Sequence, residues 1–168
     1  MFLSQLGQTR GVPAQLLSSV KSSNDAHRKW TERRLEQLLD GVSGKTVAIW
    51  GLTYKPGTDT LRRSSSVELC EGLADRRGTV RAHDPAVKTL PPELANRIHL
   101  PGSAAGALDR ASALVISTPW PEFREVAAAE LTTRMARPLV LDPNRFAGGT
   151  LGNKAGIEYV SVGRSVLW

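Results

Sequence analysis

The stretch from 45 to 66, which reads KTVAIWGLTYKPGTDTLRRSSS, constrains the fold of this chain more than any other. Its apolar run at 47–50 is rich in β-branched and aromatic residues, is too short for a helix and ends at Gly51, which predicts a buried strand. After a polar loop, Ser65 and Glu68 form a capping-box pattern, and apolar residues then recur at helical spacing. The stretch therefore predicts a strand, a long loop and a helix. In an open parallel sheet such a loop lies at the ligand-binding edge.

The rest of the chain repeats this alternation. Short runs typical of strands follow at 79–83, 98–100, 113–117, 139–141 and 157–160, and short helices are expected at 91–96 and 103–109. Alternating strands and helices favour right-handed crossovers between parallel strands. We therefore predict an α/β fold with an open, Rossmann-like parallel sheet of about five or six strands and flanking helices. Asp84, at the end of the second strand, is interpreted as a turn residue.

Apolar residues also recur at helical spacing from Pro13 to Asp40, where Gly41 ends the pattern. A helix of that length spans about 40 Å, which is more than one face of a small domain covers. The excess length predicts a second partner for this long helix, either another copy of the chain or another domain. We divide the chain into an N-terminal helical segment, 1–41, and an α/β domain, 42–168.

Composition excludes several classes of protein. Hydrophobic residues make up 40% and charged residues 23% of the chain, as in ordinary globular proteins, and no apolar run suggests a membrane span or signal peptide. The single cysteine rules out an internal disulfide and suits a cytoplasmic protein. Although the net charge is +6, the basic residues occur in pairs among acidic neighbours, which argues against nucleic acid and favours a smaller polyanion such as a nucleotide diphosphate.

Two common phosphate-binding motifs fail to explain the loop after residue 50. The dinucleotide fingerprint needs glycines where this loop has threonine and proline, and the Gly-Lys-Thr triplet at 44–46 precedes its strand instead of following one. Lys55, Arg62 and Arg63 remain as candidate anion ligands, because the two arginines lie just before a helix N-terminus whose dipole favours negative charge. A solvated surface loop explains the same residues.

The exit loops of parallel strands share one edge of the sheet. We therefore expect Tyr54 and Lys55 to line one crevice with residues that follow two later strands, which are Thr118, Trp120, Asn144 and Arg145. A lysine and an arginine suit a diphosphate, while an aromatic ring can cover a base or a sugar. Loop packing is the alternative for the tyrosine, and a packing wedge between two prolines is the alternative for the tryptophan.

Four motifs in this chain resemble those of a known family. The segment at 51–66, GLTYKPGTDTLRRSSS, is similar to the segment that opens the C-terminal domain of the UDP-glucose/GDP-mannose dehydrogenases. The other three motifs follow in the family's order and read VRAHDP, STPWPEF and LDPNRF. The resemblance covers essentially the whole chain, and it implies a UDP-binding domain with the central helix that precedes it.

The resemblance also implies roles for single residues. The family's counterparts of Tyr54 and Lys55 contact a UDP-sugar, as does the counterpart of Arg145. The arginine matching Arg62 reaches NAD, which is held mainly by an N-terminal domain. The helix matching residues 1–40 pairs across a dimer axis in the family, which implies a homodimer through the long helix.

The chain departs from the family pattern at several places. Thr60 stands where the family usually has Asp, and Arg63 where it has Glu, which reverses a charge beside Arg62. The catalytic cysteine loop and the Gly-rich NAD fingerprint have no counterpart in this sequence. Cys70 is no substitute, because its apolar helix position predicts a buried, inactive thiol. No catalytic group is assigned, and the three histidines have no metal-like spacing.

Two functions fit these observations. The first is the nucleotide-sugar-binding C-terminal domain of an NAD-dependent UDP-glucose/GDP-mannose 6-dehydrogenase, inactive alone and completed by an N-terminal half or split subunit. The second is a free-standing nucleotide-binding or regulatory module derived from that domain. The sugar, and the choice between UDP and GDP, stay open at this point.

Overall fold

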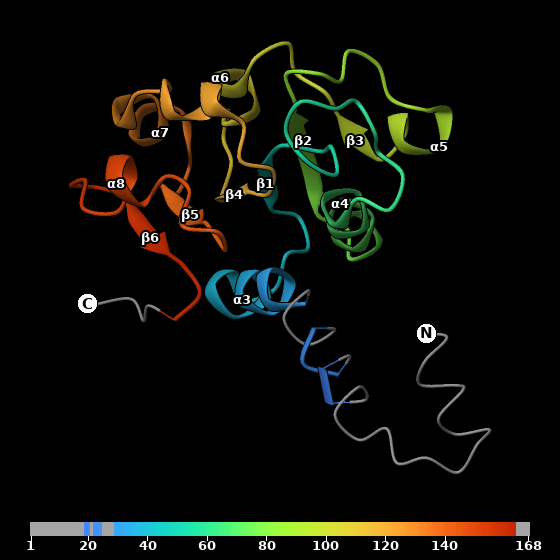
Figure 1. Ribbon diagram of the computed structural model, residues 1–168. Helices are drawn as coiled ribbons and strands as arrows, with labels where there is room; N and C mark the ends of the chain where they lie inside the picture. Colours follow the sequence, from blue (N-terminus) through green and yellow to red (C-terminus); the bar gives the residue numbers. More distant parts are fainter. Residues whose placement is uncertain (1–18, 21, 25–28, 164–168) are drawn as a thin grey trace.

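Six short parallel strands form one sheet in the computed structural model, which describes residues 19–20, 22–24 and 29–163. The strands are β1 (Thr46–Trp50), β2 (Thr79–His83), β3 (Ile98–His99), β4 (Ala113–Ile116), β5 (Leu139–Leu141) and β6 (Glu158–Val160). They lie in the order β3-β2-β1-β4-β5-β6, so the strand order reverses between β1 and β4 (Figure 1). The predicted open parallel α/β sheet is confirmed.

Helices cover both faces of the sheet (Figure 1). The buried side chains of α3 (Trp30–Leu39), α4 (Ser65–Asp75) and α5 (Pro92–Ala95) belong to one core cluster, and those of α6 (Ala104–Ala107), the 3-10 turn η1 (Pro121–Arg124), α7 (Ala128–Arg134) and α8 (Gly148–Leu151) belong to the other. The sequence pattern did not predict η1, α7 and α8. Within the described part of the chain, none of these helices has the length and apolarity needed to cross a membrane.

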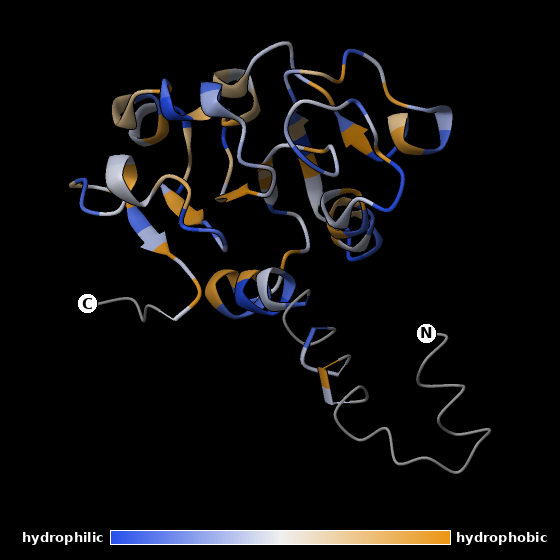
Figure 2. Cartoon of the chain, viewed as in Figure 1, coloured by the Kyte–Doolittle hydropathy of each residue, from blue (hydrophilic) through white to orange (hydrophobic). Residues whose placement is uncertain are grey.

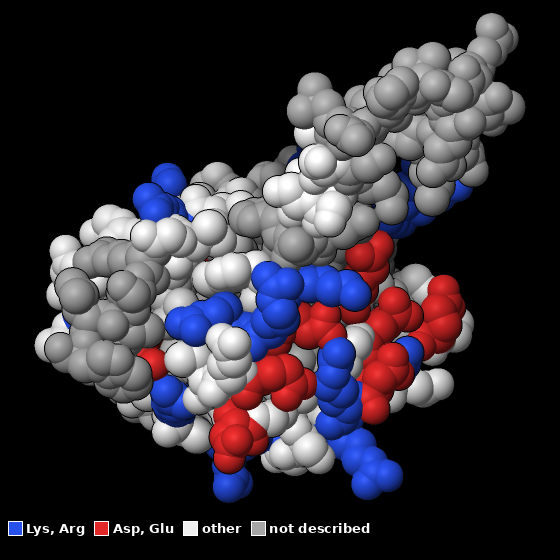
Figure 3. Space-filling view, turned by 90° about the horizontal axis from the view of Figure 1, so that it is seen from below, with Lys and Arg blue, Asp and Glu red and all other residues white. Residues whose placement is uncertain are grey.

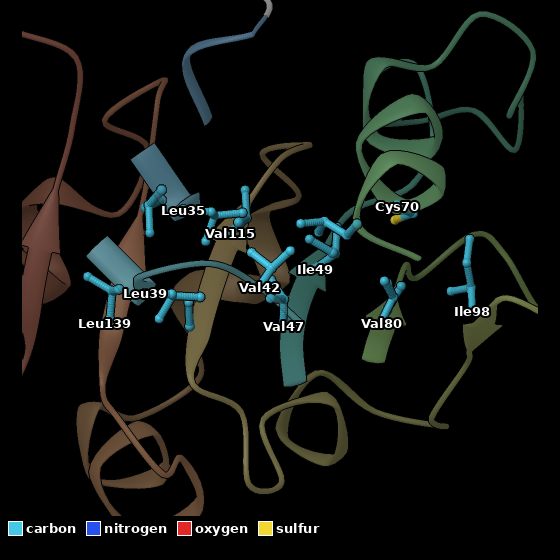
Figure 4. Packing of buried hydrophobic residues seen from close by; sticks show 14 of the residues in the cluster. Leu35, Leu39, Val42, Val47, Ile49, Cys70, Val80, Ile98, Val115 and Leu139 are labelled. Atoms are coloured by element: carbon cyan, nitrogen blue, oxygen red, sulfur yellow. The ribbon is translucent and has the colours of Figure 1, made fainter. Parts of the chain in front are cut away.

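The two core clusters follow from the alternation of side chains along each strand. Val47 and Ile49 of β1 pack with the α3 and α4 layer, whereas Ala48 and Trp50 pack with the α6 and α7 layer. Figure 4 shows the first cluster, in which leucines of α3 and Cys70 of α4 surround the strand residues. Since both faces are covered, the central strands β1, β4 and β5 read as nearly continuous apolar runs, whereas β2 alternates between apolar and polar residues. Figure 2 shows hydrophobic residues on β4 and β5.

The helix α3 covers only part of the long helix expected between 13 and 40. It ends where Asp40 (φ 51°) and Gly41 (φ 82°) adopt the left-handed conformation, so the predicted stop is confirmed. Residues 19–20 and 22–24 are also helical, and the other positions expected before Lys29 lie outside the described residues. The dimer through the long helix stays a prediction.

The predicted capping box of α4 is wrong by one residue. Ser64 is the N-cap, and its Oγ accepts a hydrogen bond from the Ser66 N–H (3.2 Å). The same hydroxyl donates to the carbonyl of Leu52 (2.6 Å), which buries Ser64 and leaves Ser65 exposed. The contact with the β1 exit loop therefore decides which of three consecutive serines starts the helix.

Candidate functional site

The loops that leave β1, β4 and β5 are joined by hydrogen bonds along the carboxyl edge of the sheet. The Thr118 hydroxyl, after β4, donates to the carbonyl of Thr53, after β1 (2.6 Å). On the other side, the Asn144 amide, after β5, donates to the carbonyl of Ser117 (3.5 Å). The structure thus brings the predicted crevice loops together at one edge, on both sides of the point where the strand order reverses.

Asp84, the first residue after β2, is the centre of this hydrogen-bond network and is only 1% exposed. Its Oδ2 accepts from the Leu52 N–H (2.7 Å), from both the N–H and the hydroxyl of Thr53 (2.9 Å each), and from the Trp120 indole N–H (3.1 Å). Its Oδ1 accepts from the Ala86 N–H (2.9 Å), which is the expected turn bond. The turn interpretation was therefore incomplete, because Oδ2 joins three exit loops.

The β1 exit loop holds its backbone in place and leaves two side chains free. The Tyr54 N–H donates to the carbonyl of Thr60 (2.9 Å), and the Thr58 hydroxyl donates to the carbonyl of Lys55 (3.0 Å). The Tyr54 side chain is 66% exposed, so loop packing does not explain it. The Lys55 side chain is exposed as well, and no described residue pairs with its ammonium group. Both side chains are available to a ligand.

Arg62 and Arg63 lie at the end of the same loop, just before α4. Both are exposed, and neither forms an ion pair or hydrogen bond with the described residues, so a helix-flanking salt bridge does not explain Arg62. Arg63 adopts the left-handed conformation (φ 59°), which precedes the turn into the helix. The loop therefore adds two unpaired positive charges to this edge.

Arg145 lies on the β5 exit loop in the left-handed conformation (φ 55°), and its side chain is exposed. Its guanidinium donates to the carbonyl of Val162 (2.6 Å), which ties the loop to the chain after β6. The base of the loop is held by Asp142, whose Oδ2 accepts from the Ala147 N–H and the Tyr159 hydroxyl (2.7 Å each). With one of its five N–H donors used, the guanidinium can still form a forked contact with an anion.

Trp120 is a packed and hydrogen-bonded residue and not a free aromatic surface for a ligand. Its indole N–H donates to Asp84 and to the Thr53 hydroxyl (3.3 Å), and its ring is half-buried against the second core cluster. The packing-wedge interpretation is therefore right about the ring and missed the polar contacts. The indole nitrogen has no donor left for a ligand.

Cys70 is buried in α4, and this burial, with the nearby charge of Glu71, raises the pKa of its thiol to about 12. A thiol with that pKa is protonated at neutral pH and is not a nucleophile. The predicted inert cysteine is confirmed. Among the described residues, no group of three or more His, Cys, Asp or Glu side chains is placed to hold a metal ion.

Ion pairs neutralise part of the charged surface outside the crevice, where five arginines of the described residues have acidic partners. Seen from below (Figure 3), Lys and Arg side chains lie beside Asp and Glu side chains instead of forming one basic face. Arg76 of α4 pairs with Glu32 and Glu36 of α3, and Arg97 pairs with Glu71 and Asp75 of α4. This mixture matches the expectation drawn from the paired charges in the sequence.

Sequence reasoning missed two residues that hold the site. Asp84 and Asp142 each fix an exit loop, and each is the first residue after a strand and is followed by proline. The repeated Asp-Pro dipeptide was the available signal. An aspartate can bond backbone N–H groups nearby, and the proline ends the strand by withholding a donor.

A family model describes the same region. Residues 48–148 match the UDP binding domain of the UDP-glucose/GDP-mannose dehydrogenase family. The match runs from β1 to the start of α8 and so includes all the exit loops that are joined at the carboxyl edge.

Individual proteins agree with this match. The chain is 34% identical to UDP-glucose 6-dehydrogenase of Pseudomonas aeruginosa, covering 94% of this chain and 36% of that protein, and 31% identical to UDP-glucose 6-dehydrogenase of Rickettsia prowazekii, covering 98% and 38%. A UDP-glucose dehydrogenase structure from Pyrobaculum islandicum superposes with a TM-score of 0.70 at 26% identity, covering 82% of this chain and 31% of that chain. This chain thus spans about a third of the length of these relatives, from 31% to 38%.

Proposed function

Because this chain belongs to the UDP-glucose/GDP-mannose dehydrogenase family and is matched over its UDP binding domain, we propose that its carboxyl edge binds the UDP part of a nucleotide sugar. The observation that carries this proposal is the row of hydrogen-bonded exit loops. The row presents unpaired cationic donors on the β1 loop and a partly free guanidinium on the β5 loop. Such an edge, at the point where strand order reverses, is where open α/β sheets bind ligands.

Three side chains divide the recognition of the nucleotide. The Lys55 ammonium and the Arg145 guanidinium bind the diphosphate, because both are exposed cations on loops whose backbones are fixed. The guanidinium contributes a planar fork and the ammonium a point charge. The exposed Tyr54 ring covers the base or the sugar. The mixed charges on the face that Figure 3 shows favour this small ligand over nucleic acid.

NAD enters the proposal through one residue of this chain. Arg62 is exposed and unpaired among the described residues, so it fits a single contact with a cofactor phosphate. The turn after β1 does not fit the main NAD-binding contact. A dinucleotide-binding turn lets its backbone approach the pyrophosphate closely, whereas here the buried residues Leu52 and Thr53 follow Gly51. When bound, NAD supplies the hydride acceptor. We place its main binding surface on an N-terminal half of the enzyme or a split subunit.

The role of this chain is therefore to hold a substrate that another part of the enzyme oxidises. We keep the division into a helical segment, 1–41, and an α/β domain, 42–168. The helical segment is anchored on that domain by Leu35 and Leu39 of α3, which lie in its first core cluster. A homodimer formed through this segment is part of the proposal.

Calorimetric titration of the chain with UDP, GDP and UDP-glucose, at low and moderate salt, tests the site. We expect selective binding of the UDP compounds. Lys55→Ala and Arg145→Ala should each lower affinity by about 10- to 100-fold, which is the loss of one hydrogen bond to a charged group.

Matched controls lie at the amino edge of the sheet. Lys154→Ala removes an exposed lysine in the turn before β6, and Arg110→Ala removes an exposed arginine before β4 that shares the positive φ of Arg145. Both should leave affinity unchanged. Absence of UDP binding in the unmodified chain, or equal losses in the controls, would contradict the proposed site.

The chain alone should form no NADH from UDP-glucose and NAD. The one cysteine of the sequence is a buried thiol with a pKa of about 12, and it cannot carry covalent chemistry. NADH formation measured at 340 nm is a direct check, and a steady rate proportional to chain concentration would contradict the expected inactivity.

A further inference from the structure

Asp84 is too buried and too fully bonded to touch a ligand. It is 1% exposed, and its two oxygens accept hydrogen bonds from Ala86 and from three groups of the β1 loop and one of the β4 loop. Any effect of this carboxylate on binding must pass through the loops that it holds. We propose that Asp84 is a positioning residue, which sets the conformation in which the β1 loop presents Tyr54 and Lys55. The ligand in this inference rests on the proposed function, whereas the ordering of the loop does not.

The β1 loop needs an acceptor at this place. The chain leaves the sheet at Gly51, whose φ of 90° and close approach to Thr118 leave no room for a side chain: a Cβ there would lie 2.4 Å from the Thr118 Cβ. The next two N–H groups, those of Leu52 and Thr53, are buried and have left the strand ladder. Buried N–H groups require partners, and Asp84 supplies the only one that each has among the described residues.

The bonds around Thr53 then fix the residues that follow. Its N–H and its hydroxyl donate to Asp84, and its carbonyl accepts from the Thr118 hydroxyl. The N–H and the carbonyl of Thr53 are therefore both hydrogen-bonded, which fixes the backbone at the residue that directly precedes Tyr54. The Tyr54 N–H closes the remainder of the loop on Thr60. Lys55 thus lies inside a small loop whose entry point is oriented by Asp84.

Asp84→Asn tests this role with little change in shape. An amide has one acceptor oxygen, so it cannot serve the Oδ2 donors and the Ala86 N–H together. We expect the Tyr54 amide hydrogen, which does not contact Asp84, to exchange at least about tenfold faster in the variant. The Val115 amide in β4 is fully buried and exchanges only through global unfolding, so its rate should change only as the overall loss of stability requires and serves as the global reference. Unchanged Tyr54 exchange would overturn the inference, and this measurement needs no nucleotide.

A double-mutant cycle separates positioning from general loss of stability. Asp84→Asn should weaken UDP binding by about tenfold in the unmodified chain and in Arg145→Ala, but by only about threefold in Lys55→Ala, where the contact of Tyr54 alone is still positioned by Asp84. A merely structural role would give the same loss in all three backgrounds, and that outcome would overturn the inference. If the unmodified chain binds no UDP, the proposed function fails, and the exchange rates alone decide whether Asp84 orders the loop.

Trp120→Phe covers the case in which Asp84→Asn does not fold. It removes one donor from the carboxylate, keeps an aromatic ring in the second core cluster and leaves Asp84 in place. We expect a smaller effect in the same direction, with the Tyr54 amide hydrogen exchanging about threefold faster than in the unmodified chain. Identical Tyr54 exchange in this variant and in the unmodified chain would overturn the inference.

Discussion

Two buried aspartates, Asp84 after β2 and Asp142 after β5, are each followed by proline and yet hold their loops in different ways. The carboxylate of Asp84 uses both oxygens and accepts five hydrogen bonds from residues of three loops. The carboxylate of Asp142 uses only Oδ2, which accepts from Ala147 and Tyr159, and its buried Oδ1 has no partner among the described residues.

The difference follows from the place of each strand in the sheet. β2 lies beside β1, so Asp84 reaches the loop at which strand order reverses and, across it, the β4 loop. β5 lies between β4 and β6, and Asp142 bonds only to its own loop and to the last strand. The aspartate of the Asp-Pro dipeptide thus joins several loops after β2, whereas after β5 it closes a single loop. We conclude that the carboxylate that holds the β1 loop links the loops of three strands, whereas the carboxylate at the base of the β5 loop bonds only within that loop and to β6.

Asp84→Ala should produce the largest loss of stability. It leaves buried donors of Leu52, Thr53 and Trp120 without an acceptor, and we expect the free energy of unfolding to fall by about 4 kcal/mol. Urea denaturation followed by tryptophan fluorescence measures this change. A loss below about 1 kcal/mol would show that the loops do not depend on this carboxylate.

Gly51→Ala should come second, at about 3 kcal/mol, because the new Cβ meets Thr118 backbone and side-chain atoms at 2.4–2.7 Å. Gly57→Ala, later in the same loop, is the matched control, since it also has a positive φ (79°) but no atom within 4 Å of the new Cβ. It should cost only about 1 kcal/mol. Equal midpoints in urea for the two variants would contradict the close contact between the β1 and β4 loops.

The isosteric pair Asp84→Asn and Asp142→Asn tests the comparison most directly. At residue 84 an asparagine has only one acceptor oxygen, so either the donors that now reach Oδ2 or the Ala86 N–H lose their partner. We expect the free energy of unfolding to fall by about 2 kcal/mol. At residue 142 the amide nitrogen can take the place of the unpartnered Oδ1, so the loss should stay below about 0.5 kcal/mol. Thermal unfolding of both variants at one pH is the measurement. Equal melting temperatures would remove the distinction between the two carboxylates.

Tyr159→Phe should have a small effect, about 1 kcal/mol, because it removes one hydrogen bond to Asp142 and keeps the ring. The same substitution should leave Tyr54 amide exchange unchanged, since the β5 loop is held separately from the β1 loop. Faster exchange of Tyr54 in this variant would mean that the two loops are coupled.

The sheet was predictable from sequence because its central strands β1, β4 and β5 are buried on both faces and stand out as short apolar runs, while β2 shows the alternation of a strand with one more exposed face. The edge position of Lys55 and Arg145 followed from that topology, although their roles stay predictions. The bonds of Asp84 were not predictable, because they join residues 31 to 36 positions apart and depend on strand order. For the same reason the cap of α4 was placed on Ser65, since only the contact of Ser64 with the β1 loop distinguishes the serines.

The α-helices that the sequence did not predict, α7 and α8, are short and lack a side-chain N-cap. α7 has seven residues and α8 has four, and neither has a side-chain hydrogen bond at its N-terminus. Their positions are fixed by Leu131 and Leu151, which are buried in the second core cluster. Burial against the sheet, and not helix propensity, therefore accounts for these short segments.

The buried thiol of Cys70 has a practical consequence for experiments on these loops. Since it is the only cysteine in the chain and has a pKa of about 12, thiol-specific reagents should leave the folded protein unlabelled at neutral pH. A cysteine introduced at an exposed loop position would then be the single reactive site. A dye or spin label attached there would report the motion of that loop alone, with no need to remove the natural cysteine first.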